Sequence, residues 1–213
     1  MIRWDVIQGN LPLIGAKLLE HLALTLVAVV GGLIISGVAM VFIRDRPRVV
    51  GLLTGFFGVV YTIPSLALLA FLVPLTHLSF VTAEIALVGY TLFILTRNLL
   101  AGLASVPRDA LDAADGMGYG RARRLWQVEI PLALPLIVAG IRIATVTTIG
   151  LVMVTALIGF GGLGQVMLRG YNFRNDTLVL VGFVLTVALG LIADLGLGWL
   201  GRAITPWSRA RAA

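Results

Sequence analysis

The residue types best suited to recognition, which are carboxylates, arginines and glycines, lie together in one segment, residues 112–135. This segment reads DAADGMGYGRARRLWQVEIPLALP. It holds three carboxylates and three arginines, and three of its glycines occupy alternate positions. Glycine allows positive φ angles and close backbone approach, whereas arginines pair with acidic groups of a protein or with lipid headgroups. The segment therefore indicates a recognition surface, and for its arginines a protein partner and lipid both remain open.

Other kinds of chemistry have little support in the sequence. The chain has no cysteine, and the positions of its two histidines, His21 and His77, do not indicate a metal site. A P-loop needs the pattern G-x-x-x-x-G-K-[ST], whereas the one lysine, Lys17, lies in IGAKLL. GFGGLG at residues 159–164 has the spacing of a dinucleotide loop but follows an apolar run rather than a strand. We therefore expect no catalytic residue, no metal and no cofactor.

The composition is that of a membrane protein. Hydrophobic residues make up 59% of the chain and charged residues 12%, whereas soluble domains have about 25% charged residues. Apolar runs such as LALTLVAVVGGLIISGVAMVFI are long enough to span a bilayer and lack the alternation of a β-barrel. We predict an all-α polytopic membrane protein with a single domain, residues 1–213. Its net charge of +6 then reflects basic connections rather than binding to nucleic acid.

Five transmembrane helices are predicted, at residues 22–43, 49–75, 81–96, 136–160 and 178–200. Pro64 is expected to bend the second, because proline removes a backbone donor. Gly51 and Gly55 form a G-x-x-x-G pair in this span, which suits close packing within the bundle or against a second subunit. Residues 5–20 are amphipathic and are expected to lie on the outer surface.

Basic residues are distributed unevenly between the two sides of this topology. Eleven of the 16 lie on one side: Arg44, Arg46, Arg48, Arg97, Arg108, Arg121, Arg123, Arg124, Arg202, Arg209 and Arg211. By the positive-inside rule that side is cytoplasmic, so the N-terminus lies outside and the C-terminus in the cytoplasm. Residues 105–131 then form a cytoplasmic segment, in which we expect a short helix, a sharp glycine turn and a second short helix that ends at Pro131.

The spacing within this segment resembles the EAA loop of bacterial ABC-importer permeases of type I fold. In general form that loop reads E-A-A, three residues, G, nine residues, I, one residue, L-P. The positions that fit it here are Asp112, Ala113, Ala114, Gly118, Val128, Ile130 and Pro131. The departure is Asp112, which stands where the family usually has glutamate and is one methylene shorter.

The resemblance implies a transport subunit of the bacterial inner membrane that is not itself an enzyme. In the family, this loop forms a coupling helix that docks on a separate ATP-binding subunit. The residues expected to dock are Asp112, Ala113, Ala114, Met117, Gly118, Tyr119 and Arg121. The implied partners are two ATP-binding subunits, a second permease subunit of the same or a related kind, an extracytoplasmic solute-binding protein and membrane lipid.

Three further stretches resemble the osmoprotectant branch of these permeases, which imports glycine betaine, carnitine or choline. They are VYTIPSLALLAFLVPL, GYTLFILTRNLLAGLASVP and ALIGFGGLGQVMLRGYNF. Permeases for methionine and other amino acids share the five-span core and stay as an alternative. The residues that can line a translocation path are Tyr61, Pro64, Ser65 and Tyr90, with Phe57 and Phe93 beside them. Aromatic faces suit a quaternary ammonium group, although each of these rings can equally serve packing.

Two other functions remain as alternatives. A gradient-driven transporter needs ionisable residues inside the membrane, and the candidates are Glu84, Arg142 and Asp194. All three are predicted near the ends of spans, with Asp194 the deepest. A membrane scaffold without transport activity is the third possibility. Neither alternative predicts the spaced loop at residues 112–131.

Overall fold

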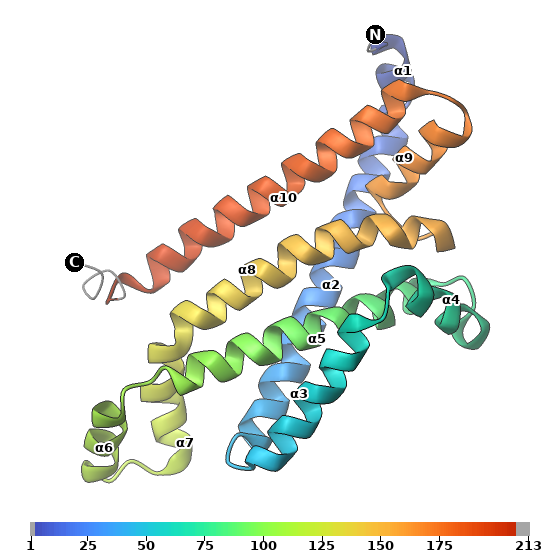
Figure 1. The fold of residues 1–213 in the computed structure, drawn as a ribbon. Coiled ribbons are helices and arrows are strands. Elements are labelled where there is room, and N and C mark those ends of the chain that lie inside the picture. The colour runs from blue at the N-terminus through green and yellow to red at the C-terminus, as the bar shows by residue number, and fades with distance from the viewer. Residues whose placement is uncertain (1–2, 208–213) are drawn as a thin grey trace.

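The computed structural model describes residues 3–207, and every regular element in that range is a helix. The body is built from four long helices: α2 (Leu11–Ile43), α5 (Phe80–Ala104), α8 (Ile130–Thr155) and α10 (Asp176–Ile204). In Figure 1, α8 lies between α5 and α10, and α2 runs behind them. The all-α fold predicted from composition is confirmed. Two of the tail arginines counted for orientation, Arg209 and Arg211, lie outside the described residues.

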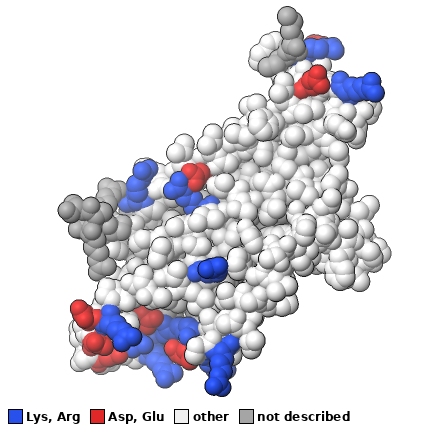
Figure 2. Space-filling view, in the orientation of Figure 1, with Lys and Arg blue, Asp and Glu red and all other residues white. Residues whose placement is uncertain are grey.

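The number of membrane-spanning helices depends on one bent pair. The four long apolar regions that can cross a membrane are Leu11–Ile43, Phe80–Ala104, Arg121–Ile158 and Asp176–Ile204. Helices α3 (Pro47–Thr62) and α4 (Ser65–Thr76) make a fifth if they are taken together, although they are bent by 98°. Most charged side chains gather toward the two ends of the molecule, and only a few basic and acidic side chains lie on the face between them (Figure 2). This distribution fits a body that is embedded in lipid.

The helix at the third predicted span is longer than residues 81–96. Helix α5 continues to Ala104 and carries Arg97 within it. The guanidinium of Arg97 lies 5.5 Å from the centre of the Phe93 ring, so its charge is accommodated on the helix surface. Residues 5–20, predicted to be amphipathic and to lie on the outer surface, are divided between two helices. A short helix, α1 (Trp4–Gly9), is followed by α2, whose Pro12 lies in the first turn, where a missing N–H costs nothing.

The bundle is tightly packed where small residues allow the helices to approach. A Cβ atom on Gly140 of α8 would lie 2.4 Å from the Cβ of Asn98 on α5, so only glycine fits there. Gly51 and Gly55 of α3 behave differently, since nothing lies within 4 Å of the Cβ position of either residue. Their G-x-x-x-G pair therefore does not serve packing inside this chain. The main core cluster lies between α2, α4, α5 and α8 and includes Leu24, Ala28, Leu69, Ala83, Leu87 and Val152.

The glycine-rich stretch at residues 159–164 forms a closely packed corner between α8 and α9 (Leu163–Asn172). The buried His21 of α2 lies close to the Ile149 carbonyl through Nε2, at 3.1 Å, and accepts from the Leu163 N–H at 3.3 Å. Gly162 has a φ of +50°, and a Cβ atom there would lie 2.5 Å from the Cβ of His21. The corner is thus fixed against α2 rather than being a flexible turn.

Candidate functional site

The segment singled out in the sequence folds as a helix, a glycine turn and a second helix. Helix α6 (Arg108–Gly116) is followed by α7 (Arg121–Arg124), and Figure 1 places both beyond the ends of the long helices. The turn closes with two backbone bonds, from Tyr119 N–H to the Ala114 carbonyl (3.0 Å) and from Gly118 N–H to the Asp115 carbonyl (2.9 Å). These bonds are the pattern of a Schellman helix end, and Gly118 supplies its positive φ of 77°.

Pro131 does not end the second helix, contrary to the prediction. A π-helical turn, Leu125–Glu129, joins α7 to α8, and the chain changes direction there (Figure 1). The Ile130 N–H bonds to the Leu125 carbonyl, five residues back instead of four. A wider turn of this kind accommodates a proline, which brings no N–H of its own and a bulky ring. The helix therefore passes through Pro131 into the membrane span.

The residues predicted to dock lie on two different faces. Those that are exposed are Asp112, Ala113, Met117, Gly118 and Arg121, and together we call them the docking surface. Tyr119 is half-buried, and its ring lies 4.2 Å from the guanidinium carbon of Arg123. Ala114 is completely buried. Its small side chain packs within this chain, so Ala114 is not part of the exposed docking surface.

A chain of ion pairs ties the docking surface to the membrane helices. Arg124 donates to both oxygens of Asp115 in α6, at 2.8 and 2.6 Å, and to one oxygen of Glu129 at 3.0 Å. The other Glu129 oxygen accepts from Arg44, directly after α2. The side chains of Arg44 and Glu129 are only 12% and 10% exposed. We call Asp115, Arg124, Glu129 and Arg44 the ion-pair chain. Arg124 thus belongs to the ion-pair chain. Its partner Glu129 was not among the site residues predicted from the sequence.

The break at Pro64 separates α3 from α4 completely, so it is more than the expected bend. The buried Tyr90 of α5 donates its hydroxyl to the Ile63 carbonyl at the break. Tyr90, which was predicted to line a translocation path, therefore has its hydroxyl engaged in stabilising the break. Ser65 begins α4 and is half-buried, whereas Tyr61 is exposed and stacks on Phe93 at a ring distance of 4.8 Å. The carbonyl of Val60 accepts from the Ile63 N–H at 3.2 Å.

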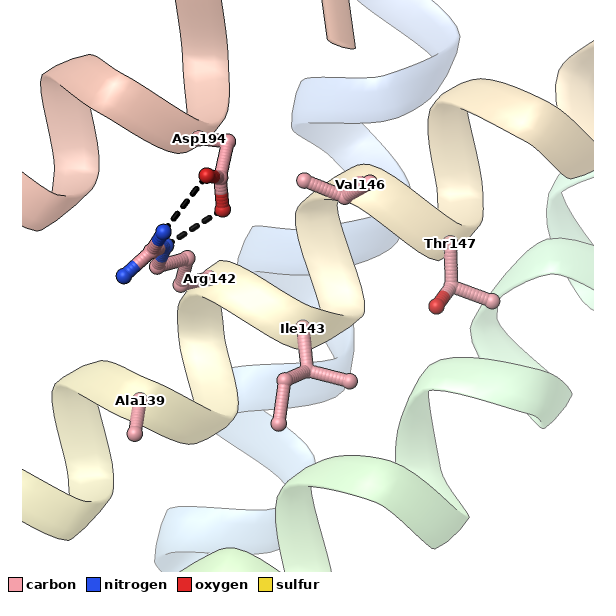
Figure 3. Close-up of a pocket in the computed structure, with 6 residues that line it drawn as sticks. All are labelled: Ala139, Arg142, Ile143, Val146, Thr147 and Asp194. Atoms are coloured by element: carbon pink, nitrogen blue, oxygen red, sulfur yellow. Dashed lines mark hydrogen bonds and ion pairs between the residues drawn. The ribbon is translucent and has the colours of Figure 1, made fainter. Parts of the chain in front are cut away.

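Of the charged residues predicted near the ends of spans, Arg142 is placed differently, whereas Glu84 does lie close to the start of α5. Arg142 lies well inside α8 rather than near its end, and its guanidinium donates two hydrogen bonds to the carboxylate of Asp194 on α10 (Figure 3). A cavity of about 430 Å³ lies beside the pair. Glu84 of α5 is buried, and neither of its carboxylate oxygens has a hydrogen-bond partner among the described residues. No group of metal-ligating side chains occurs in the described part of the chain.

The sequence matches one protein family along most of its length. Residues 28–206 fit the family described as "Binding-protein-dependent transport system inner membrane component". The chain belongs to this family. It is therefore an inner-membrane permease component, and such a component is a non-enzymatic transport subunit.

Three named relatives of this permease cover almost all of its length. The glycine betaine/carnitine/choline transport system permease protein OpuCB of Bacillus subtilis is 36% identical over 88% of this chain and 86% of that protein. The choline transport system permease protein OpuBB of the same organism is 33% identical, over 89% of this chain and 88% of that protein. The carnitine transport permease protein OpuCD of Listeria monocytogenes is 32% identical, over 97% and 93%.

Solved structures support the same fold for the permease. A chain of the MetNI methionine ABC transporter, in an inward-facing conformation, matches with a TM-score of 0.81 over 92% of this chain and 98% of that chain. A chain of an amino acid ABC transporter matches with a TM-score of 0.74 over 97% and 99%. The sequence identities are 24% and 18%, so these matches concern the fold alone.

Proposed function

We propose that this permease is the transmembrane subunit of an ATP-driven importer for osmoprotectants such as glycine betaine, carnitine or choline. The cargo is supported by relatives named for these solutes, which are 32–36% identical over 88% or more of the chain. The observation that carries the coupling role is the docking surface, an exposed helix end. It belongs to a segment that lies beyond the ends of α5 and α8 (Figure 1).

The docking surface has the properties of a protein contact. Ala113 has no side chain beyond Cβ, so a partner can approach the helix closely. Met117 is an exposed, adaptable apolar side chain, and Arg121 is largely exposed and free to meet an acidic group. Arg121 does have Asp45 at 3.9 Å, but a contact of that length between exposed side chains is weak. A separate ATP-binding subunit docks on this surface, one for each of two permease copies or related chains.

The orientation of the permease follows from its basic connections. The end with α6, α7 and the α2–α3 connection faces the cytoplasm, where ATP is available, because arginines concentrate there. The end with α1 and α9 then faces outward, where a solute-binding protein delivers cargo. Transport proceeds by alternating access, in which the ATP-binding subunits move α6 and the ion-pair chain carries that movement to α8 and α2.

The test is transport by the reconstituted complex. The permease is placed in proteoliposomes with its ATP-binding subunit and binding protein, and uptake of betaine, choline, carnitine and methionine is measured together with ATP hydrolysis. Gly118→Leu is compared with Gly120→Leu. Both positions are open, with nothing within 4 Å of the Cβ position, but only Gly118 has a positive φ.

The Gly118 variant is expected to lose most uptake and cargo-stimulated ATP hydrolysis, because the added side chain strains the turn by about 1–2 kcal/mol and projects from the docking surface. The Gly120 variant keeps both. Normal uptake in the Gly118 variant refutes the docking role. Uptake of methionine alone assigns the permease to amino acids, and uptake that survives without ATP but is abolished by an ionophore assigns it to a gradient.

A further inference from the structure

The Arg142–Asp194 pair lies on the one side of α8 that its neighbours leave uncovered. Helices α5 and α10 flank α8, and α2 runs behind it (Figure 1). On the remaining side of α8, Ile143 and Val146 are exposed and line a cavity together with Ala139 and the ion pair (Figure 3). The cavity on this face has a volume of about 430 Å³, which lies within the range of small-molecule sites. Its wall combines the ion pair with apolar side chains and the hydroxyl of Thr147.

The exposure of Arg142 and Asp194 indicates that this face of α8 does not contact lipid. The side chains of Arg142 and Asp194 are 43% and 33% exposed, although both belong to helices that cross the membrane. Charged side chains inside a membrane face the bundle interior or a water-filled cavity, because contact with lipid tails is costly. The open face of α8 is therefore turned toward an aqueous path or a second permease copy rather than toward lipid.

We propose that Arg142 and Asp194 form a cargo site for a small zwitterion in this path, a proposal that rests on the proposed function. The guanidinium takes the carboxylate of the cargo, and the Asp194 carboxylate takes its quaternary ammonium group. Each charge then exchanges one partner for another, so no charge is left unpaired in a region of low dielectric constant. Ile143 and Val146 offer apolar contacts to the methyl groups of the cargo.

A purely structural tie between α8 and α10 is the competing explanation. It explains the pair but not the cavity beside it. Room around the guanidinium is also maintained by Gly198 of α10, where a Cβ atom would lie 3.3 Å from one Arg142 nitrogen. A tie holds the helices whatever the cargo, whereas a cargo site makes the effect of Arg142 depend on the charge of the cargo. The experiment therefore measures whether the effect of substituting Arg142 depends on the charge of the cargo.

Uptake of glycine betaine, a zwitterion, and of choline, a cation without a carboxylate, is compared in the reconstituted complex with saturating loaded binding protein. Arg142→Gln is expected to lower the ratio of betaine to choline uptake by about tenfold or more, the value of a hydrogen bond between charged groups. Asp194→Asn lowers uptake of both cargoes, because both carry the quaternary ammonium. Arg48→Gln, at an exposed arginine in the first turn of α3 that does not line the cavity, is expected to leave the ratio unchanged.

Equal loss of betaine and choline uptake in Arg142→Gln overturns the site and leaves only the structural tie. If that variant does not assemble, Arg142→Lys keeps the charge without the two-pronged geometry, and an unchanged ratio there overturns the site as well. Uptake of choline but no zwitterion by the unaltered permease also refutes it. If the unaltered permease takes betaine and no choline, equal betaine uptake by Arg142→Gln and Arg48→Gln refutes it. Uptake of none of these solutes by an assembled complex refutes the proposed function instead.

Discussion

Glu129→Gln is the most informative test of the ion-pair chain. Glu129 accepts hydrogen bonds from Arg44 with one oxygen and from Arg124 with the other. Glutamine keeps the size of the side chain but removes its charge, which leaves Arg44 beside a neutral group while Arg124 retains Asp115. Removing one member of a buried pair costs about 3–5 kcal/mol, whereas an exposed pair contributes at most about 1 kcal/mol. For side chains that are 10–12% exposed, we expect a loss of about 2–3 kcal/mol in the free energy of unfolding.

The assay is unfolding of the purified permease in mixed micelles, titrated with a denaturing detergent and followed by circular dichroism. Asp115→Asn is the matched control, because it removes a carboxylate of the same ion-pair chain whose side chain is about half exposed. We expect it to cost about 1 kcal/mol or less. The double variant with Arg44→Gln measures the coupling directly, since it removes both partners of the buried pair.

The double variant is expected to lose about 1–3 kcal/mol less than the sum of the two single variants. Losses that add to within about 0.5 kcal/mol would mean that Arg44 and Glu129 do not stabilise each other. The functional readout is the amount of cargo moved for each ATP hydrolysed, which Glu129→Gln is expected to lower. An unchanged ratio, together with the lost stability, would show that the pair supports the fold but does not transmit movement.

Two further substitutions test the packing that holds the bundle. Gly162→Ala is expected to lower the thermal midpoint of the permease strongly, because the new methyl group collides with His21 and costs about 1–3 kcal/mol beyond the strain of a positive φ. The control is Gly159→Ala, which has a positive φ but open space around its Cβ position and should therefore cost only the strain. Equal midpoints for the two variants would exclude the collision. Tyr90→Phe should cost about 1–3 kcal/mol, because the Ile63 carbonyl loses its donor at the break between α3 and α4; an unchanged midpoint would mean that this carbonyl finds another donor.

The fold class could be predicted from the sequence because lipid imposes long apolar runs on any helix that spans it. The end of α5 could not be predicted from the sequence. Arg97 has the appearance of a connection residue, and only the neighbouring ring of Phe93 explains how a charged side chain stays on the helix surface. Pro131 was misjudged for a related reason. Proline usually ends a helix, but the π-helical turn before it supplies the room that a regular α-helix lacks.

The candidate site was predicted in its position but not in its internal contacts. The spacing from Asp112 to Gly118 located the exposed turn, since a helix that ends in a Schellman motif needs a glycine at that point. The burial of Ala114 could not be read from the motif, because it depends on which face of α6 packs against the rest of the chain. Glu129 was also missed. Its two arginine partners come from separate segments, and sequence spacing does not bring Arg44 beside it.

One helix links the two functions argued for this permease. Helix α8 starts directly after Glu129 and carries Arg142, which lies about 20 Å further along at 1.5 Å per residue. Movement of the docking surface that reaches Glu129 through the ion-pair chain therefore also reaches the wall of the cavity. Substitutions in the ion-pair chain and substitutions at the cavity are therefore expected to have different effects on transport. Glu129→Gln weakens the transmitted movement and lowers transport of every cargo alike, whereas Arg142→Gln changes which cargo is moved. If Glu129→Gln altered the betaine-to-choline ratio instead, the separation of coupling from cargo recognition along α8 would be wrong.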